Sequence, residues 1–165
     1  IYAIEKLQML GAKVIACSDS NGYIYDKNGL NLDTIKQLKE INRARISAYL
    51  HHHPQATYVD AGNIWDLPCA LAFPCATQNE LNATSAATLV KNGCIAVIEG
   101  ANMPVTPEGI KIFIDAGIAY APGKAANAGG VATSALEMQQ NASRDTWTFD
   151  YTEKRLQTIM QNIHN

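Results

Sequence analysis

The sequence lacks the features that mark several large classes of protein. None of its four cysteines sits in a CxxC pair, and no Cys/His cluster with metal-ligand spacing is present. No stretch approaches the roughly 20 apolar residues that are needed to cross a bilayer. Charged residues make up only 17% and the net charge is -2, so there is no electrostatic case for nucleic-acid binding. The composition therefore argues against zinc-binding, membrane-spanning and nucleic-acid-binding proteins.

What is present is the composition of a globular protein. The chain has 165 residues, 47% of them hydrophobic, which is about one domain with a core of its own. Each cysteine lies in or beside an apolar run, so we expect four buried, free thiols in a reducing compartment. On this basis the protein is predicted to be cytoplasmic.

One pattern occurs three times along the chain: a helical segment ends in glycine and a short apolar run follows. The pairs are "EKLQMLG" with "AKVIACSDS", "ATLVKNG" with "CIAVIEGANMP" and "IKIFIDAG" with "IAYAPGKAAN". Gly11, Gly93 and Gly117 stand where helices commonly end in a left-handed residue. Residues 14–17 and 95–98 are continuously apolar, which is typical of strands buried on both faces, and "CALAFPC" is a further run of this kind.

Alternation of helices and buried strands predicts an α/β fold with a parallel sheet and right-handed crossovers. Thr106 followed by Pro107 predicts a helix start, and a long helical pattern runs from about Leu32 to Tyr49. We expect a Rossmann-like, doubly wound, mostly parallel sheet.

In an open parallel sheet, ligands bind beyond the carboxyl ends of the strands. Small residues, amides and hydroxyls fill the segments that follow the four predicted strands. These segments are 18–20, 74–80, 100–104 and 122–130. Such groups suit ribose and carboxamide better than a metal or a hydrolytic nucleophile. No metal site is predicted, because the adjacent side chains of the one histidine tract, 51–53, point in different directions on a helix.

Two interpretations of Asp19 remain open. An acid at the end of the second strand of a Rossmann fold usually binds the ribose hydroxyls of adenosine, and hydroxyls of Ser18 and Ser20 can donate to a phosphate. The alternative is a Ser-Asp turn that caps a loop. A basic helix face follows, formed by Lys39, Arg43 and Arg45. Such a face is usually only solvated, but one of these residues could reach a 2′-phosphate.

The run "GKAANAGGVATSALEMQQN" (123–141) places small residues and an amide at the entrance of a helix. Small side chains let a ligand approach closely, so this entrance is a candidate binding site. Together with "PCATQNEL" (74–81) and "EGANMPVTPEG" (99–109), it resembles the coenzyme domain of the glutamate dehydrogenase family. The resemblance is strongest to the hexameric, NADP-preferring microbial type, and it keeps the order and spacing of all three motifs. It implies that residues 1–165 are a single dinucleotide-binding domain whose sheet is incomplete at both ends.

The resemblance implies roles for individual residues in coenzyme binding. Ala76 and Thr77 would lie along the cofactor, and Asn102 would bind the nicotinamide ribose or carboxamide. Asn127 would bind the nicotinamide and the amino-acid end of the substrate. The adenosine ribose and its 2′-phosphate would be surrounded by Ser18, Asp19 and Ser20. The coenzyme implied is NADP, with NAD as the alternative.

The same resemblance implies a pocket for L-glutamate, which would be converted reversibly into 2-oxoglutarate and ammonia. The pocket would be lined by Gly130, Val131 and Ser134, with Ser134 reaching the side-chain carboxylate. No nucleic-acid or membrane partner is implied, and the complete protein would be a homohexamer.

The sequence also departs from the pattern of that family. Ala70 replaces an acid in "CALAFPC", and Asn42 stands where some NADP-using members have a lysine. Nothing in residues 1–165 matches the first strand, the glycine-rich turn or the N-terminal substrate domain that carries the family's catalytic lysine and aspartate. We therefore expect no catalytic residue, and no dehydrogenase activity, in this segment alone.

Two other functions remain open at this point. The first is a sister enzyme of the leucine or phenylalanine type, against which the polar Ser134 argues. The second is a non-catalytic nucleotide-binding module, because a fold does not by itself determine a function.

Overall fold

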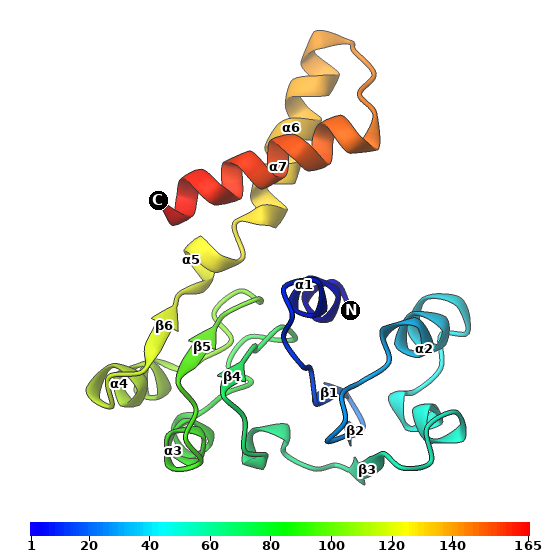
Figure 1. Ribbon diagram of the computed structural model, residues 1–165. Coiled ribbons are helices and arrows are strands. Elements are labelled where there is room, and N and C mark those ends of the chain that lie inside the picture. The colour runs from blue at the N-terminus through cyan, green and yellow to red at the C-terminus, as the bar shows by residue number, and fades with distance from the viewer. The chain divides into compact units, whose positions relative to one another are not determined.

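The computed structural model describes residues 1–165, which form two compact units, Ile1–Leu67 and Pro68–Asn165. Each unit contains one three-stranded sheet, and the two sheets are of different kinds (Figure 1). The sheet of the first unit is antiparallel with the order β1-β2-β3, and the sheet of the second is parallel with the order β4-β5-β6.

The first unit combines its antiparallel sheet with several short helices. Its regular elements are α1 (Tyr2–Met9), β1 (Ala16–Asp19), β2 (Gly22–Tyr25), α2 (Leu32–Lys36), a π-helical turn (Gln37–Ile41), a 3-10 helix (Ile46–His51), β3 (Thr57–Asp60) and a 3-10 turn (Ile64–Asp66). Ile24, Ile35, Leu38 and Tyr49 are central to its core. The buried Tyr49 hydroxyl accepts the N–H of Asn31 at 2.7 Å, so its polar end is also satisfied.

The prediction that the first apolar run forms a parallel strand buried on both faces is wrong. The strand is β1, and it pairs antiparallel with β2 in a register that places Asp19 opposite Gly22. Only Ser20 and Asn21 connect the two strands. So short a connection permits only antiparallel pairing, because a parallel neighbour needs a crossover of a dozen or more residues.

The expected continuous helix from Leu32 to Tyr49 is interrupted. The α-helix α2 passes into the π-helical turn, which ends at Ile41, and a separate 3-10 helix begins at Ile46. Arg43 between them has a φ of 50°, which is left-handed, so the helical path cannot continue through it. The N–H of Ala44 then bonds the carbonyl of Leu38 and closes the turn at 2.8 Å.

The second unit confirms the predicted α/β class and its parallel sheet. Its elements are β4 (Leu71–Ala72), α3 (Ala83–Lys91), β5 (Ala96–Ile98), α4 (Pro107–Asp115), β6 (Ala119–Ala121), α5 (Gly123–Ala126), α6 (Gly129–Ser143) and α7 (Phe149–His164). The helices α3 and α4 are the crossovers between successive parallel strands, and they pack against each other (Figure 1). Helices α6 and α7 pack against each other and cross at a wide angle (Figure 1).

Local signals predicted the helix ends correctly. Gly11, Gly93 and Gly117 all have positive φ, at 85°, 84° and 69°, directly after the helices that they end. Thr106 is the N-cap of α4, and its side chain accepts the N–H of Gly109 at 3.3 Å. Pro107 occupies the first turn, where its missing N–H costs nothing.

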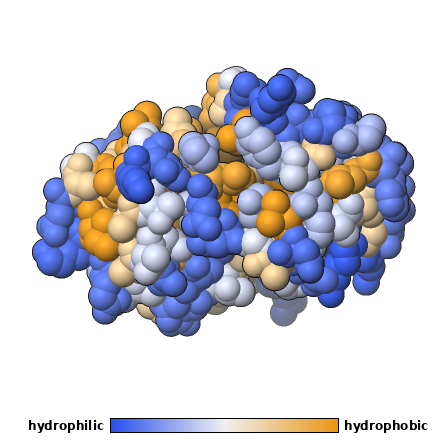
Figure 2. All heavy atoms as spheres, turned by 90° about the horizontal axis from the view of Figure 1, so that it is seen from below, coloured by the Kyte–Doolittle hydropathy of each residue, from blue (hydrophilic) through white to orange (hydrophobic).

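Burial of the parallel strands is less complete than their apolar runs indicate. Val97 in β5 is fully buried, whereas Ile95, just before this strand, is 65% exposed and Leu71 is also exposed. The expectation of strands buried on both faces is therefore wrong for these positions. Figure 2 shows apolar patches interrupted by hydrophilic side chains on the face that it draws. No helix in the structure has the length and apolarity to cross a membrane.

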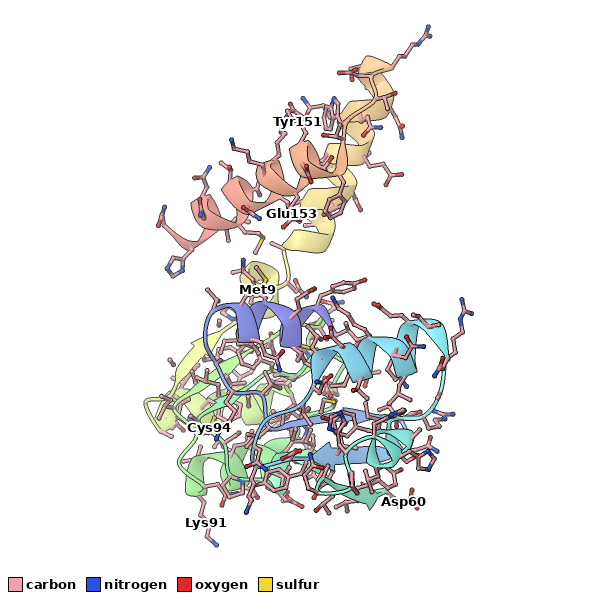
Figure 3. All side chains as sticks on the ribbon, turned by 45° about the vertical axis from the view of Figure 1, so that its right-hand side comes forward. Met9, Asp60, Lys91, Cys94, Tyr151 and Glu153 are labelled. Carbon is pink, nitrogen blue, oxygen red and sulfur yellow. The ribbon has the colours of Figure 1, made fainter.

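The four thiols are free, as predicted, but they are not all buried. Cys94 is buried, Cys17 and Cys69 are half-buried, and Cys75 is exposed. Cys94 lies just before β5, while the side chain of Lys91 extends outward from the end of α3 (Figure 3). Cys75 differs because it follows β4 in a loop, and a loop residue has no sheet face to cover it.

Candidate functional site

The loops that follow β4 and β5 are in direct contact. The Pro74 carbonyl, after β4, accepts the N–H groups of Gly100 at 2.9 Å and of Ala101 at 3.1 Å, after β5. A side chain at Gly100 would overlap the Cys75 sulfur, so only glycine permits this approach. The two loops therefore form one surface at the carboxyl edge of the parallel sheet.

The loop after β4 is held from within by Glu80. Its Oε1 accepts the N–H of Ala76 at 2.8 Å. Burial raises the pKa of Glu80, and hydrogen bonds from the backbone of Ala76 and Thr77 oppose that rise. Ala76 and Thr77 themselves are exposed, so a ligand can reach them. The N–H of Asn79 bonds the Met103 carbonyl at 3.0 Å and joins this loop again to the one after β5.

Asn127 connects the start of the third segment to the second. Its Nδ2 donates to the carbonyl of Ala101 at 2.7 Å, and its own N–H donates to the carbonyl of Gly123 at 2.8 Å. A Cβ on Gly123 would lie 2.9 Å from the Ala101 oxygen, which explains a glycine at the first position of α5. The structure therefore brings Asn127 beside Ala101, whose neighbour Asn102 is exposed.

A buried carboxylate lies beneath these loops. Glu99 is only 4% exposed, and it accepts the N–H of Val105 at Oε1 and the N–H of Gly123 at Oε2, at 3.3 and 2.6 Å. The hydroxyl of Tyr120 is also buried and has no hydrogen-bond partner of good geometry. Burial and the nearby Glu99 carboxylate both raise the pKa of Tyr120. The motifs did not indicate a role for Glu99, although this residue begins one of the three.

The predicted substrate residues lie at the start of α6. Gly130 and Ser134 are four residues apart, which places them on one face of the helix. Both are exposed, and a Cβ built on Gly130 would meet no other atom within 4 Å. Val131 is 71% exposed. This face of α6 is open, so its small residues are not needed for packing within the chain.

Ser18, Asp19 and Ser20 lie at the end of β1 in the first unit. Asp19 has a side chain that is only 10% exposed, and Lys39 lies 3.1 Å from its Oδ2. The same carboxylate accepts the N–H of Ile46 at 2.9 Å and the N–H of Asn21 at 3.0 Å. Burial alone would raise the pKa of Asp19, but these hydrogen bonds and the Lys39 ammonium outweigh it and the pKa lies below the usual value.

The two serines beside Asp19 are exposed. Arg45 donates to the Ser20 hydroxyl at 2.7 Å, so two members of the predicted basic face, Lys39 and Arg45, reach the loop. Lys39 is not simply solvated, as it binds Asp19 and the Ala44 carbonyl. The Asn42 side chain accepts a hydrogen bond from Gln37 at 3.2 Å. The turn-capping interpretation of Asp19 is confirmed, because its Oδ1 accepts the N–H of Asn21, whereas the ribose-binding interpretation stays a prediction.

No sequence signal identified Lys39 as the partner of Asp19, because the two are 20 positions apart. One sequence signal pointed to Glu99: it is an acid at the end of an apolar strand, where an unpaired charge is costly.

The histidine tract at 51–53 contributes in part to packing in the first unit. His53 stacks on Tyr49 with ring centroids 4.4 Å apart and bonds the Thr34 hydroxyl at 2.9 Å.

The second unit has the architecture of α/β proteins that bind ligands beyond the carboxyl ends of parallel strands. Residues 1–165 match the family described as Glutamate/Leucine/Phenylalanine/Valine dehydrogenase, and the chain belongs to this family.

Individual relatives agree with this assignment. The chain is 52% identical to a glutamate dehydrogenase of Bacteroides thetaiotaomicron, over 99% of its own length. It is 49% identical to an NADP-specific glutamate dehydrogenase of Helicobacter pylori, also over 99% of its length. Among solved structures, the glutamate dehydrogenase of Plasmodium falciparum matches 98% of the chain at 48% identity with a TM-score of 0.91.

In each case the chain matches only part of the relative. It spans 37% of the Bacteroides protein, 38% of the Helicobacter protein and 35% of the Plasmodium chain. The fold and the family are therefore established for this segment, while the activity of the whole protein is a separate question.

Proposed function

We propose that residues 1–165 are the dinucleotide-binding domain of an enzyme that oxidatively deaminates L-glutamate. With NADP and water, the reaction gives 2-oxoglutarate, ammonium, NADPH and a proton, and it is reversible. The observation that carries the proposal is the joined surface at the carboxyl edge of β4-β5-β6. There the hydrogen bond between Asn127 and Ala101 holds two motifs together, with Asn102 exposed beside them.

The exposed groups of this surface fit a nicotinamide nucleoside. The amide of Asn102 and the hydroxyl of Thr77 are accessible and match a carboxamide and ribose hydroxyls in hydrogen-bonding capacity. Asn127 uses its Nδ2 on Ala101, which leaves its Oδ1 as the acceptor for a ligand donor. NADP, when bound, supplies a nicotinamide ring that takes the hydride from the substrate Cα. The chain's own contribution is to hold ring, ribose and substrate in place.

Ser134 supports a substrate with a polar side chain. It lies on the open face of α6 with Gly130, where a hydroxyl can donate to a carboxylate. An enzyme for leucine, valine or phenylalanine would bury an apolar side chain and gain nothing from that hydroxyl. This alternative, and that of a non-catalytic nucleotide-binding module, are decided by the same experiment.

The preference for NADP over NAD is proposed from the first unit. Lys39 neutralises Asp19, the one acid in the loop, and Arg45 and Ser20 present donors beside it. Charge-assisted hydrogen bonds of this kind are about twice as strong as neutral ones. Relatives named as NADP-specific support the same preference.

The test is a substrate and coenzyme panel on the full-length protein. L-Glutamate, L-leucine, L-valine and L-phenylalanine are each offered with NADP and with NAD, and reduced coenzyme is followed by absorbance. We expect the highest kcat/KM for glutamate with NADP. Highest activity with an apolar amino acid would support the sister enzymes, and binding of NADPH with no turnover of any substrate would support the non-catalytic module.

We also propose that the complete protein is a cytoplasmic homohexamer, by analogy with the family type that it resembles. Sedimentation equilibrium of the full-length protein measures the number of subunits directly. Cell fractionation with an antibody to the protein tests the compartment.

A further inference from the structure

Glu99 is a buried carboxylate for which the proposed chemistry has no use. It follows β5, and its own N–H donates to the Ala121 carbonyl at the end of β6, at 3.0 Å. Each of its two carboxylate oxygens accepts a different backbone N–H, from Val105 and from Gly123. Burying a carboxylate costs folding free energy unless it accepts such hydrogen bonds. An apolar side chain would avoid that cost, so the carboxylate is expected to have a role at this position.

The two segments that Glu99 joins carry the two asparagines of the proposed site. Val105 ends the loop that contains Asn102, and Gly123 begins the helical turn that leads to Asn127. The N–H of Asn127 donates to the Gly123 carbonyl at 2.8 Å. A shift of the Gly123 backbone would therefore move the backbone of Asn127 as well. Glu99 is the one buried carboxylate of the second unit. Glu80 is half-buried, and it accepts hydrogen bonds only from N–H groups of its own loop.

We propose that Glu99 is a positioning residue that sets the separation between Asn102 and Asn127. The proposal rests on the function proposed above for these asparagines. The charge and shape of a carboxylate are both needed, because two N–H donors approach from two sides and each requires an acceptor. A glutamine has the same shape but offers one acceptor and one donor, so one backbone N–H would face another donor.

The experiment compares the full-length wild type with E99Q, with G123A and with D115N. Asp115 is an exposed carboxylate on α4 whose partner is Lys111, so D115N removes a charge without touching the bridge. G123A disturbs the same bridge from its other end, because its Cβ would lie 3.1 Å from the Glu99 Oε2 and 2.9 Å from the Ala101 oxygen. It keeps the proposal testable if E99Q does not fold.

We measure the dissociation constant for NADPH by fluorescence titration, steady-state kcat and KM, and thermal unfolding. We expect E99Q to weaken NADPH binding and raise its KM by up to about a hundredfold, because misplacing a binding group by about 1 Å can cost that much. D115N should match the wild type. A purely structural role would lower the amount of active protein, and hence the apparent kcat, with KM and the dissociation constant unchanged, and this result would overturn the proposal.

Amide hydrogen exchange at Val105 and Gly123, without coenzyme, tests the bridge independently. Faster exchange at both amides in E99Q, with other amides of the unit unchanged, supports it, and unchanged exchange overturns it. If the wild type binds neither NADPH nor NADH, the proposed function fails, and the exchange data still decide whether Glu99 holds the two segments together.

Discussion

The Lys39 ammonium lies 3.1 Å from the Asp19 carboxylate, at the end of the first strand of the chain. Lys39 also donates to the Ala44 carbonyl at 3.1 Å, so it is held from two sides. An acid at this place would by itself repel a 2′-phosphate. Because Lys39 neutralises Asp19, the neighbouring Arg45 and Ser20 remain available to a negatively charged ligand.

The first prediction concerns coenzyme choice. In the full-length protein, S20A should weaken the binding of NADP more than that of NAD, by about 0.5–1.5 kcal/mol for one hydrogen bond. The reason is that the Ser20 hydroxyl accepts from Arg45 and donates only through a long bond of 3.4 Å to the Asn21 Oδ1, so its proton can turn to a phosphate oxygen. Dissociation constants for both coenzymes measure the effect, with S143A, at an exposed serine of the second unit, as the control. Equal losses for both coenzymes would remove Ser20 from the phosphate site.

The second prediction is a pH dependence of stability that comes from Asp19. Its pKa is lowered in the folded state, so the unfolded chain binds its proton more readily. Asp19 therefore contributes stability above the ordinary aspartate pKa of about 3.9, and this contribution is lost as the pH falls through the lower folded value.

Urea unfolding of the wild type and of D19N from pH 7 to pH 3 measures this contribution. We expect the wild type to be more stable at pH 7 and the difference to shrink below about pH 4. D115N, which loses only an exposed ion pair, should differ little from the wild type throughout. A difference between wild type and D19N that stays constant to pH 3 would contradict the assignment.

The third prediction concerns Asn127. N127A should lower kcat/KM for glutamate by more than it lowers stability, because its Oδ1 is assigned to the ligand while its Nδ2 bonds Ala101. The lost internal bond should cost about 0.5–1.5 kcal/mol of unfolding free energy. N127D separates the two roles, since it keeps an acceptor but loses the donor to Ala101. A much lower melting temperature with unchanged kinetics would show that Asn127 is only structural.

The fourth prediction concerns the contact between the loops after β4 and β5. G100A should destabilise the protein by about 1–3 kcal/mol, because the new methyl group overlaps the Cys75 sulfur. Adding C75A to G100A should restore most of the lost stability, because it removes the sulfur. The nearest side-chain atom to the new methyl group is then the Cβ of residue 75, at 3.4 Å. Thermal unfolding of the two single variants and the double variant measures the coupling. Additive losses would mean that the two residues are not in contact.

The residues expected to bind ligands remain predictions, but the structure decides how they are arranged. The prediction that polar segments gather at strand ends rested on a general property of parallel sheets, and the loops after β4 and β5 do meet there. The sequence could not reveal that Asn127 is bonded to Ala101, because the two are 26 positions apart. A motif indicates which residues are present but not which atoms are already engaged.

Local features of the chain were determined by the sequence itself. The left-handed glycines at 11, 93 and 117 and the N-cap at Thr106 depend on backbone preferences and on hydrogen bonds within a few residues. The parallel order of the second sheet also followed from its alternation of helices and strands.

Only the tertiary structure decided the pairing of distant groups. It brought the Lys39 ammonium to the Asp19 carboxylate, 20 positions away in the chain. It also placed Glu99 between Val105 and Gly123, the second of which is 24 positions away. The physical reason is that a buried charge must be satisfied by whichever donors packing brings near it, and packing depends on the whole chain and not on a local run of residues.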